Sequence, residues 1–204
     1  MKLYYAPAAC SLAAHIALTE AGLAHDAVRV DLRTHQLPDG SDFYAVNPKG
    51  YVPVLELDDG SRLTEVAVIL QYIADRNPGT LAPVFGTIER YRVMEWINFI
   101  ATELHKGFGP LWKPDTPDAY KTIVLNNLAK RFDYIAPLLE RQPYLTGDVF
   151  TIADAYLFTI LNWSHILKVD LARWPALTRY LDRVAARPHV QQTLRAEKLL
   201  KAAA

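Results

Sequence analysis

The hydrophobic pattern of the chain changes near residue 80, and this change constrains the fold more than any other feature. Before it, short apolar runs with strand-like alternation are mixed with helical spacing. From about Thr87 onward, apolar residues follow only the three- and four-residue spacing of amphipathic helices. The pattern therefore predicts an α/β domain over residues 1–80 and an all-helical domain over residues 87–204, joined by the short segment "LAPVFGT".

The first domain is predicted to contain a parallel βαβ unit followed by an antiparallel hairpin. Alternation in "DAVRVDL" indicates a half-buried strand, and the pair Asp59–Gly60 between two apolar runs indicates a hairpin turn. The expected strands are Leu3–Tyr5, Val28–Leu32, Val52–Leu57 and Arg62–Thr64, and the expected helices are Cys10–Gly22 and Glu65–Arg76. This order gives a small sheet with helices on its faces.

The second domain is predicted to consist of helices alone. The expected helices are Ile88–Phe108, Pro117–Glu140, Thr151–Leu167, Pro175–Ala186 and Pro188–Leu199, and the terminal "KAAA" is expected to fray. The apolar stripe of the first one is formed by Met94, Ile97, Ala101 and Leu104. Asn98, Thr102 and His105 are spaced four and three residues apart, which predicts that they share a separate polar face.

The segment "TGDVFTIADAYLF" carries a helix start signal. Thr151 is placed to cap the helix, and Asp154, at the third helical position, is placed to accept a hydrogen bond from the Thr151 N–H. Gly147 permits a tight turn just before it. We interpret this capping box, with Asp in place of Glu, as structural.

The composition excludes several function classes. Lys plus Arg and Asp plus Glu both number 22, so the formal charge is zero and no basic footprint for nucleic acid or acidic membrane is present. No apolar run reaches the roughly 18 residues of a membrane span. The start "MKLYYAPAAC" has an apolar segment that is short and broken by Pro7, so we expect folded protein rather than a targeting peptide, and hence a cytoplasmic location. No metal site is predicted.

The single cysteine raises the main functional question. One cysteine excludes an internal disulfide, and the first interpretation of Cys10 is a small buried hydrophobe. However, Cys10 lies at a helix start, where free N–H groups and the helix dipole favour a thiolate. Glu65 and Val66 begin another helix, where a carboxylate ligand could bind the Val66 N–H while Glu65 accepts from an ammonium. The alternative is that Thr64 caps this helix and Glu65 merely complements the dipole.

Taken together, these segments resemble the glutathione S-transferases, and most of all their bacterial beta class. The resemblance runs along nearly the whole chain, through "MKLYYAPAACSLAAHIAL", "VNPKGYVPVLELDDG", "LTEVAVILQYIAD", "ERYRVMEWINFIATELHKGFGPL" and "FTIADAYLFT". It implies a thioredoxin-like N-terminal domain with a mixed four-stranded sheet, an all-helical C-terminal domain, a homodimer, and glutathione as co-substrate in a site between the domains.

The resemblance also implies roles for individual residues. Cys10 would face the glutathione sulfur, Glu65 and Val66 would hold the γ-glutamyl end, and Val52 would pair through its backbone with the cysteinyl part. The remaining candidates are Tyr51 and a cis-Pro53 beside Val52, and Asn98, His105 and Lys106 from the helical domain, in part across the dimer interface.

Two positions depart from the family pattern. Val66 replaces the usual Ser or Thr, so one hydrogen bond worth roughly 1 kcal/mol is lost while the backbone N–H remains. His35 replaces a Lys expected to reach the glycyl carboxylate. Because an imidazole ordinarily titrates near about 6.5, that contact would depend on pH.

The expected chemistry is attack of the glutathione thiolate on a small electrophile such as an aryl halide or epoxide. Cys10 is the first candidate to stabilise the sulfur, Ser11 the second and Tyr5 the third, while His105 would raise the local positive potential. Cys10 could instead be the nucleophile, forming a mixed disulfide that supports thiol exchange or peroxide reduction. A non-catalytic ligand-binding or interaction protein, and a dehalogenase or isomerase using glutathione, are the alternatives. Aromatic and aliphatic residues that could line the acceptor pocket, or belong to the core, are Phe108, Leu111, Trp112 and Trp163.

Overall fold

A four-stranded mixed sheet organises the N-terminal part of the chain. Its strands are β1 (Lys2–Tyr5), β2 (Asp26–Arg29), β3 (Val54–Glu56) and β4 (Arg62–Thr64), in the order β2-β1-β3-β4. The first pair, β1 with β2, is parallel and the other two pairs are antiparallel, as expected for a βαβ unit followed by a hairpin. The predicted mixed sheet is thus confirmed.

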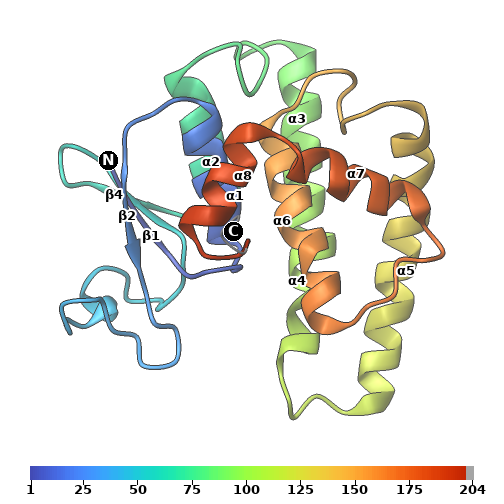
Figure 1. Cartoon of the computed structure of the whole chain (residues 1–204), viewed down its shortest axis with the longest axis horizontal. Coiled ribbons are helices and arrows are strands. Elements are labelled where there is room, and N and C mark those ends of the chain that lie inside the picture. The colour runs from blue at the N-terminus through green and yellow to red at the C-terminus, as the bar shows by residue number, and fades with distance from the viewer. Residues whose placement is uncertain (201–204) are drawn as a thin grey trace. The chain divides into compact units, whose positions relative to one another are not determined.

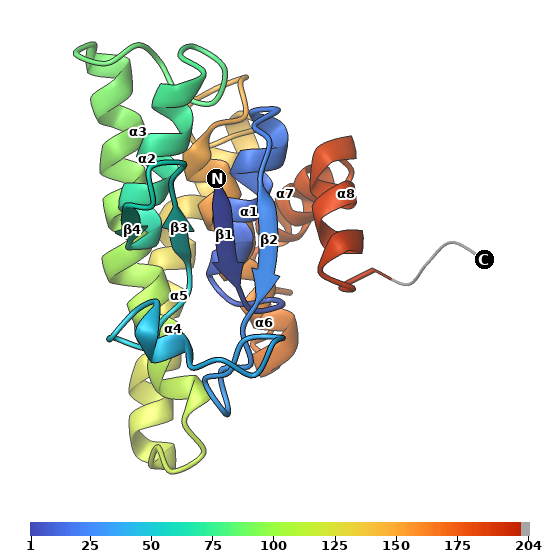
Figure 2. The ribbon, with the colours of Figure 1, turned by 90° about the vertical axis from the view of Figure 1, so that its left-hand side faces the viewer.

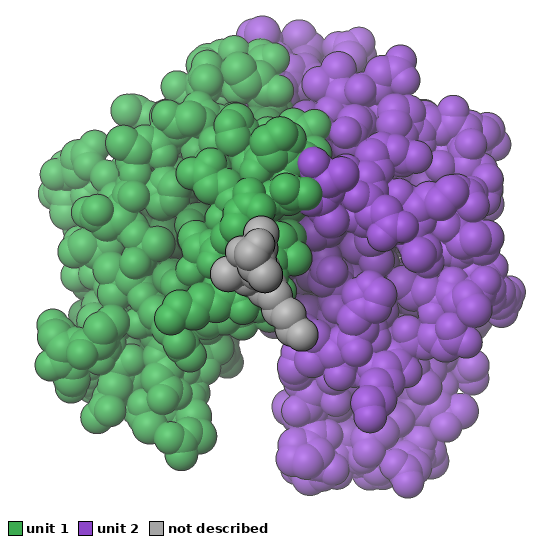
Figure 3. Space-filling model, in the orientation of Figure 1, with its two compact units in different colours: residues 1–81, 187–204 green, residues 82–186 purple. Residues whose placement is uncertain are grey.

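The computed structural model describes residues 1–200 and divides into two compact units, coloured separately in Figure 3. Unit 1 contains residues 1–81 and the described residues from Arg187 onward, and unit 2 contains residues 82–186. The terminal "KAAA", expected to fray, lies outside the described residues.

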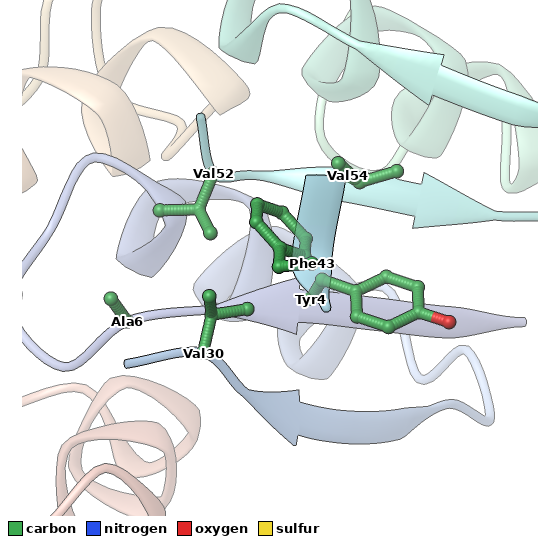
Figure 4. Close-up of a cluster of buried hydrophobic side chains, with 6 residues drawn as sticks. All are labelled: Tyr4, Ala6, Val30, Phe43, Val52 and Val54. Atoms are coloured by element: carbon green, nitrogen blue, oxygen red, sulfur yellow. The ribbon is translucent and has the colours of Figure 1, made fainter. Parts of the chain in front are cut away.

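Side chains on the two faces of the sheet build two apolar layers in unit 1. Tyr4 and Val54 are register partners and lie with Phe43 on one face, where Ala6, Val30 and Val52 complete the cluster (Figure 4). Alternation along a strand sends the next register partners, Leu3 and Leu55, to the opposite face. The helices α1 (Ser11–Glu20) and α2 (Val66–Arg76) pack together behind the strands in Figure 2.

The C-terminal helix α8 (Pro188–Ala196) belongs to unit 1 and packs against α1. The Arg187 guanidinium forms a salt bridge with the Glu20 carboxylate at 2.7 Å, and His15 Nδ1 lies 2.8 Å from Glu197 Oε1. The helix expected at Pro188–Leu199 is therefore present, and it packs against α1 within unit 1. The assignment of residues 87–204 to one domain stays a prediction.

Unit 2 is helical throughout its regular structure, as predicted (Figure 1). Its long helices are α3 (Ile88–Phe99), α5 (Asp118–Arg141), α6 (Ile152–Leu167) and α7 (Pro175–Ala185), and three short elements between α3 and α5 are η2 (Ile100–His105), α4 (Lys106–Phe108) and η3 (Gly109–Trp112). The core helix is α6, in which twelve of sixteen residues are buried. Among residues 1–200, no helix is both long enough and apolar enough to cross a membrane.

Two expected elements differ from the structure. The strand expected at Val28–Leu32 ends at Arg29, because Asp31 Oδ1 accepts hydrogen bonds from the backbone N–H groups of Arg33 and Thr34 and turns the chain. The single helix expected at Ile88–Phe108 changes into a π-helical turn at Ile100. A π turn contains more residues than an α turn, so it rotates the side chains that follow it.

Candidate functional site

Cys10 lies at the N-cap of α1 and is partly exposed rather than sealed in the core. No side chain caps this helix, and the Cys10 thiol donates to the Val52 carbonyl oxygen at 3.3 Å. The first N–H groups of a helix have no intrahelical partners and favour negative charge. The arrangement can stabilise a thiolate at the start of α1.

Ser11 and Tyr5, the rival candidates, are both buried. The Ser11 hydroxyl accepts from the Ala6 N–H at 3.1 Å and donates to the Ala6 carbonyl at 3.2 Å, so it closes the loop before α1. Tyr5 lies 5.4 Å from the His15 ring, and burial together with the charge of Glu197 raises the pKa of its phenol. The Ser11 hydroxyl is therefore engaged with the Ala6 backbone, and Tyr5 is a weaker acid than an exposed tyrosine.

The segment after Gly50 brings Val52 beside Cys10. The Val52–Pro53 peptide bond is cis, as the resemblance implied. The Val52 side chain is buried in the apolar cluster of Figure 4, so only its backbone is offered to a ligand. The Tyr51 carbonyl accepts from the Asn47 side-chain amide at 2.7 Å, while the Tyr51 ring is 67% exposed.

Glu65 precedes α2 with a φ of 69°, a left-handed conformation that is unusual for a non-glycine residue. Its carboxylate is 2.6 Å from Lys49 Nζ, and Lys49 also donates to the Thr64 hydroxyl at 3.0 Å. The Thr64 side chain does not cap the helix in the way the alternative required. Val66 is buried and begins the helix, so its contribution to any ligand is its backbone N–H.

His35 also adopts a positive φ, of 54°, and its ring lies 4.6 Å from the Tyr44 ring. Its Nδ1 is buried without a hydrogen-bond partner among the described residues. Gly50 is required here, because a Cβ at this position would lie 2.8 Å from the Tyr44 ring. These contacts hold the loop that carries His35 against the segment that leads to Val52.

His105 lies in unit 2, at the end of the π-helical turn. Its Nδ1 is 2.6 Å from the Tyr156 hydroxyl oxygen, and its ring meets the Trp163 ring edge-on at 5.1 Å. Further edge-on contacts join Trp163 to Phe108 and Trp112. His105 therefore belongs to an aromatic cluster around α6, while Lys106 is exposed next to it.

Asn98 and Thr102 line a different feature, a groove of about 590 Å³ on α3, η2 and α5. The expectation that His105 shares their face is wrong, because Thr102 and His105 both lie in the π-helical turn, where Thr102 lines the groove and His105 contacts Tyr156 of α6. The groove is lined by Glu95, Trp96, Asn98, Phe99, Thr102, Glu103, Lys130, Arg131 and Tyr134. Within residues 1–200, no group of three or more His, Cys, Asp or Glu side chains is arranged to hold a metal ion.

Comparison with known proteins decides the family. The model of the glutathione S-transferase N-terminal domain matches residues 9–76, and that of the C-terminal domain matches residues 99–188. Glutathione S-transferase GstA of Escherichia coli O157:H7 is 50% identical over 201 residues, covering 98% of this chain and 100% of that protein. The chain belongs to the glutathione S-transferase family.

Solved structures of bacterial members agree with this glutathione S-transferase throughout their length. The ternary complex of BphK, a bacterial GST, has a TM-score of 0.95 at 50% identity and covers 97% of this chain and 100% of that one. A sphingomonad glutathione S-transferase solved with glutathione has a TM-score of 0.93 at 42% identity, covering 98% and 100%. A similar structure from Sphingomonas chungbukensis is described as bacterial beta class. The predicted family, fold and transferase class are confirmed.

Two residues of this transferase were missed by the sequence analysis. Lys49 lies within "NPKG", a segment interpreted only as part of the family pattern, although a cation sixteen residues before Glu65 is an observable signal. Tyr156 lies within the helix expected at Thr151–Leu167. Nothing in the sequence distinguishes its hydroxyl, whose importance comes from the approach of His105 51 residues earlier in the chain.

Proposed function

We propose that unit 1 of this glutathione S-transferase binds glutathione at the starts of α1 and α2, and that the protein conjugates its sulfur to small electrophiles. The observation that carries the proposal is the Cys10 thiol, partly exposed at an uncapped helix start and 3.3 Å from the Val52 carbonyl. A sulfur anion bound there would accept hydrogen bonds, and the positive end of the helix dipole would stabilise its charge.

The charges around α2 suit the γ-glutamyl end of glutathione. Its ammonium would bind Glu65, whose side chain is 66% exposed, and its α-carboxylate would bind the Val66 N–H. Lys49 would move from Glu65 toward an anionic group of the ligand, since an exposed pair of this kind is held weakly. The backbone of the cysteinyl part of glutathione would form hydrogen bonds with the Val52 backbone. His35 and Tyr51 lie beside this segment and are the remaining candidates to contact the ligand.

Cys10 acts as a hydrogen-bond donor in conjugation. The glutathione thiolate attacks an electron-poor carbon, and a halide or other leaving group departs with the bonding electrons. The sulfur is then a neutral thioether, so it no longer needs the hydrogen bond from Cys10. A second reaction uses Cys10 as nucleophile: its thiolate attacks glutathione disulfide, forms a mixed disulfide and releases one glutathione thiolate. No second cysteine is present, so another glutathione resolves the mixed disulfide.

Unit 2 supplies the apolar acceptor site. The rings of Phe108, Trp112 and His105 each meet the Trp163 ring edge-on, and such an aromatic cluster suits a flat hydrophobic electrophile. His105 supplies the polar group of this cluster, and Lys106 adds positive charge beside it.

The groove on α3 and α5 is proposed to receive a second copy of the chain. Trp96, Phe99 and Tyr134 form a mutually contacting aromatic cluster there, and Tyr134 is 63% exposed. Charged and polar side chains border this cluster, as at the rim of a protein interface. Asn98, in the same groove, would then contact glutathione held by the partner.

The test combines binding with turnover. Retention on immobilised glutathione, turnover of a chromogenic aryl halide, and a dimer by light scattering are the expected results. A Tyr134→Arg variant should shift the mass toward the monomer. A protein that neither binds the resin nor turns over the halide would instead be a non-catalytic binding protein. The cytoplasmic location stays a prediction that cell fractionation can check.

A further inference from the structure

Lys49 binds the carboxylate of Glu65 in the structure, at the place proposed for the ammonium group of glutathione. Its Nζ lies 2.6 Å from Glu65 Oε1 and 3.0 Å from the Thr64 hydroxyl oxygen. Lysine and the γ-glutamyl end of the ligand carry the same donor, an ammonium group, so the two compete for one carboxylate. The free protein therefore already satisfies Glu65 with a cation of its own, which a ligand has to displace.

The pair of Lys49 with Glu65 is exposed, and a more buried carboxylate of unit 1 provides the comparison. The Glu56 side chain is 18% exposed and accepts hydrogen bonds from both Lys2 and Arg62 across the sheet. The side chains of Glu65 and Lys49 are 66% and 46% exposed, so water weakens their attraction. A lysine side chain is also a flexible four-carbon stem. The pair at Glu65 can therefore open for a ligand, whereas the pairs of Glu56 are part of the sheet.

The Thr64 hydroxyl keeps Lys49 near the site when its pair with Glu65 opens. An ammonium group has three N–H donors, and Lys49 directs one of them to Thr64 and one to Glu65. Thr64, Glu65 and Val66 are consecutive, so this ammonium lies beside the start of α2, where the ligand carboxylate is proposed to bind. We infer that Lys49 is a specificity-determining residue: the ligand ammonium displaces it from Glu65, and it then pairs with the α-carboxylate of the same ligand.

This inference rests on the proposed glutathione site, and it says which head group the exchange favours. Charges balance only for a ligand that carries an ammonium and a carboxylate on the same carbon. A ligand with the carboxylate alone places a second negative charge beside Glu65, and Lys49 has to neutralise both. A ligand with the ammonium alone displaces Lys49 without giving it a new partner. Removal of Lys49 should therefore weaken the binding of the first kind of ligand and strengthen that of the second.

Calorimetric titration of Lys49→Met with three ligands tests this reversal. Glutathione with hydrogen in place of its amino group should bind about tenfold more weakly than to the wild type, because no cation remains between two carboxylates. Glutathione with its γ-glutamyl α-carboxylate converted to an amide should bind about threefold more tightly, because the competing ammonium is gone. The Kd for glutathione itself should change by less than about threefold, since the two effects offset each other.

Two further variants control for charge and for folding. Lys49→Arg keeps a cation and should keep the wild-type order of the three affinities. Lys2→Met removes another partly exposed lysine of unit 1, which pairs with Glu56 at 3.2 Å, and should leave all three Kd values unchanged. If the wild type binds glutathione but Lys49→Met shifts both analogues in the same direction, the exchange is overturned and the proposed function stands. If the wild type binds no glutathione, the proposed function and this inference both fail.

Discussion

The helices α6 and α1 begin in opposite ways, and the difference separates a structural helix start from a functional one. At α6, Asp154 accepts from the N–H groups of Leu145 and Thr151 and from the hydroxyls of Thr151 and Tyr180, all of them in the interior. At α1, no side chain caps the helix and the partly exposed Cys10 stands at the start. A start filled by its own side chains stabilises the fold, whereas one left open can receive an anion.

Removing the side-chain cap of α6, the closed start, should have the largest effect on stability. Asp154→Ala leaves the buried N–H groups of Leu145 and Thr151 and the Thr151 hydroxyl without their acceptor, so we expect the free energy of unfolding to fall by about 3–5 kcal/mol near pH 5. Chemical denaturation at one fixed protein concentration measures this loss. Asp148→Ala removes an exposed carboxylate just before the same helix and should change stability by less than about 0.5 kcal/mol. Equal effects of the two variants would show that the cap is dispensable.

The same carboxyl should make stability depend on pH. Burial raises the pKa of Asp154 from 3.8 to about 6, so the folded protein binds this proton more tightly than the unfolded chain does. The resulting stabilisation is complete below about pH 3.8 and is lost as the pH rises through about 6. At about 1.36 kcal/mol per pKa unit, the loss is on the order of 3 kcal/mol. Asp154→Asn cannot titrate here, and an unchanged pH slope in this variant would contradict the assignment.

A substitution at the start of α1, the open start, should change the reactions of glutathione rather than the stability of the fold. Cys10→Ala should lose the mixed disulfide with glutathione completely and conjugation only in part, by about tenfold, since one hydrogen bond to the sulfur is removed. Stability should change by less than about 1 kcal/mol, because the thiol is partly exposed. Intact-protein mass spectrometry after incubation with glutathione disulfide, with steady-state rates, measures both. A wild-type protein that takes up no glutathione, or a Cys10→Ala protein that conjugates at the wild-type rate, would refute the role of Cys10.

Ser11, the adjacent residue, provides the contrasting variant at the same helix. Ser11→Ala leaves the buried N–H and C=O of Ala6 without their hydroxyl partner, so stability should fall by about 1–2 kcal/mol. The mixed disulfide should still form, because Cys10 remains in place. Loss of the disulfide in a folded Ser11→Ala protein would mean that the two residues act together on the sulfur.

The sequence predicted the closed start better than the open one. Thr151 and Asp154 are three residues apart, so their capping box is local and can be read directly from the chain. The partner of Cys10 is Val52, 42 residues away, and only the fold brings them together. Likewise, helical spacing placed Asn98 and His105 on one face, because a π turn leaves no signal in the hydrophobic pattern.

The start of α2 gives the last and smallest test, since it is open like that of α1 but carries a charge. Glu65→Gln removes the proposed partner of the ligand ammonium, so the Kd for glutathione should rise about tenfold in calorimetric titration. Stability should change by less than about 1 kcal/mol, because the pair with Lys49 is exposed. Glu89→Gln, in the first turn of α3, removes a comparable helix-start carboxylate and should leave glutathione affinity unchanged. If Glu65→Gln binds glutathione as tightly as Glu89→Gln does, the start of α2 is open without being a ligand site, and the comparison holds for α1 alone.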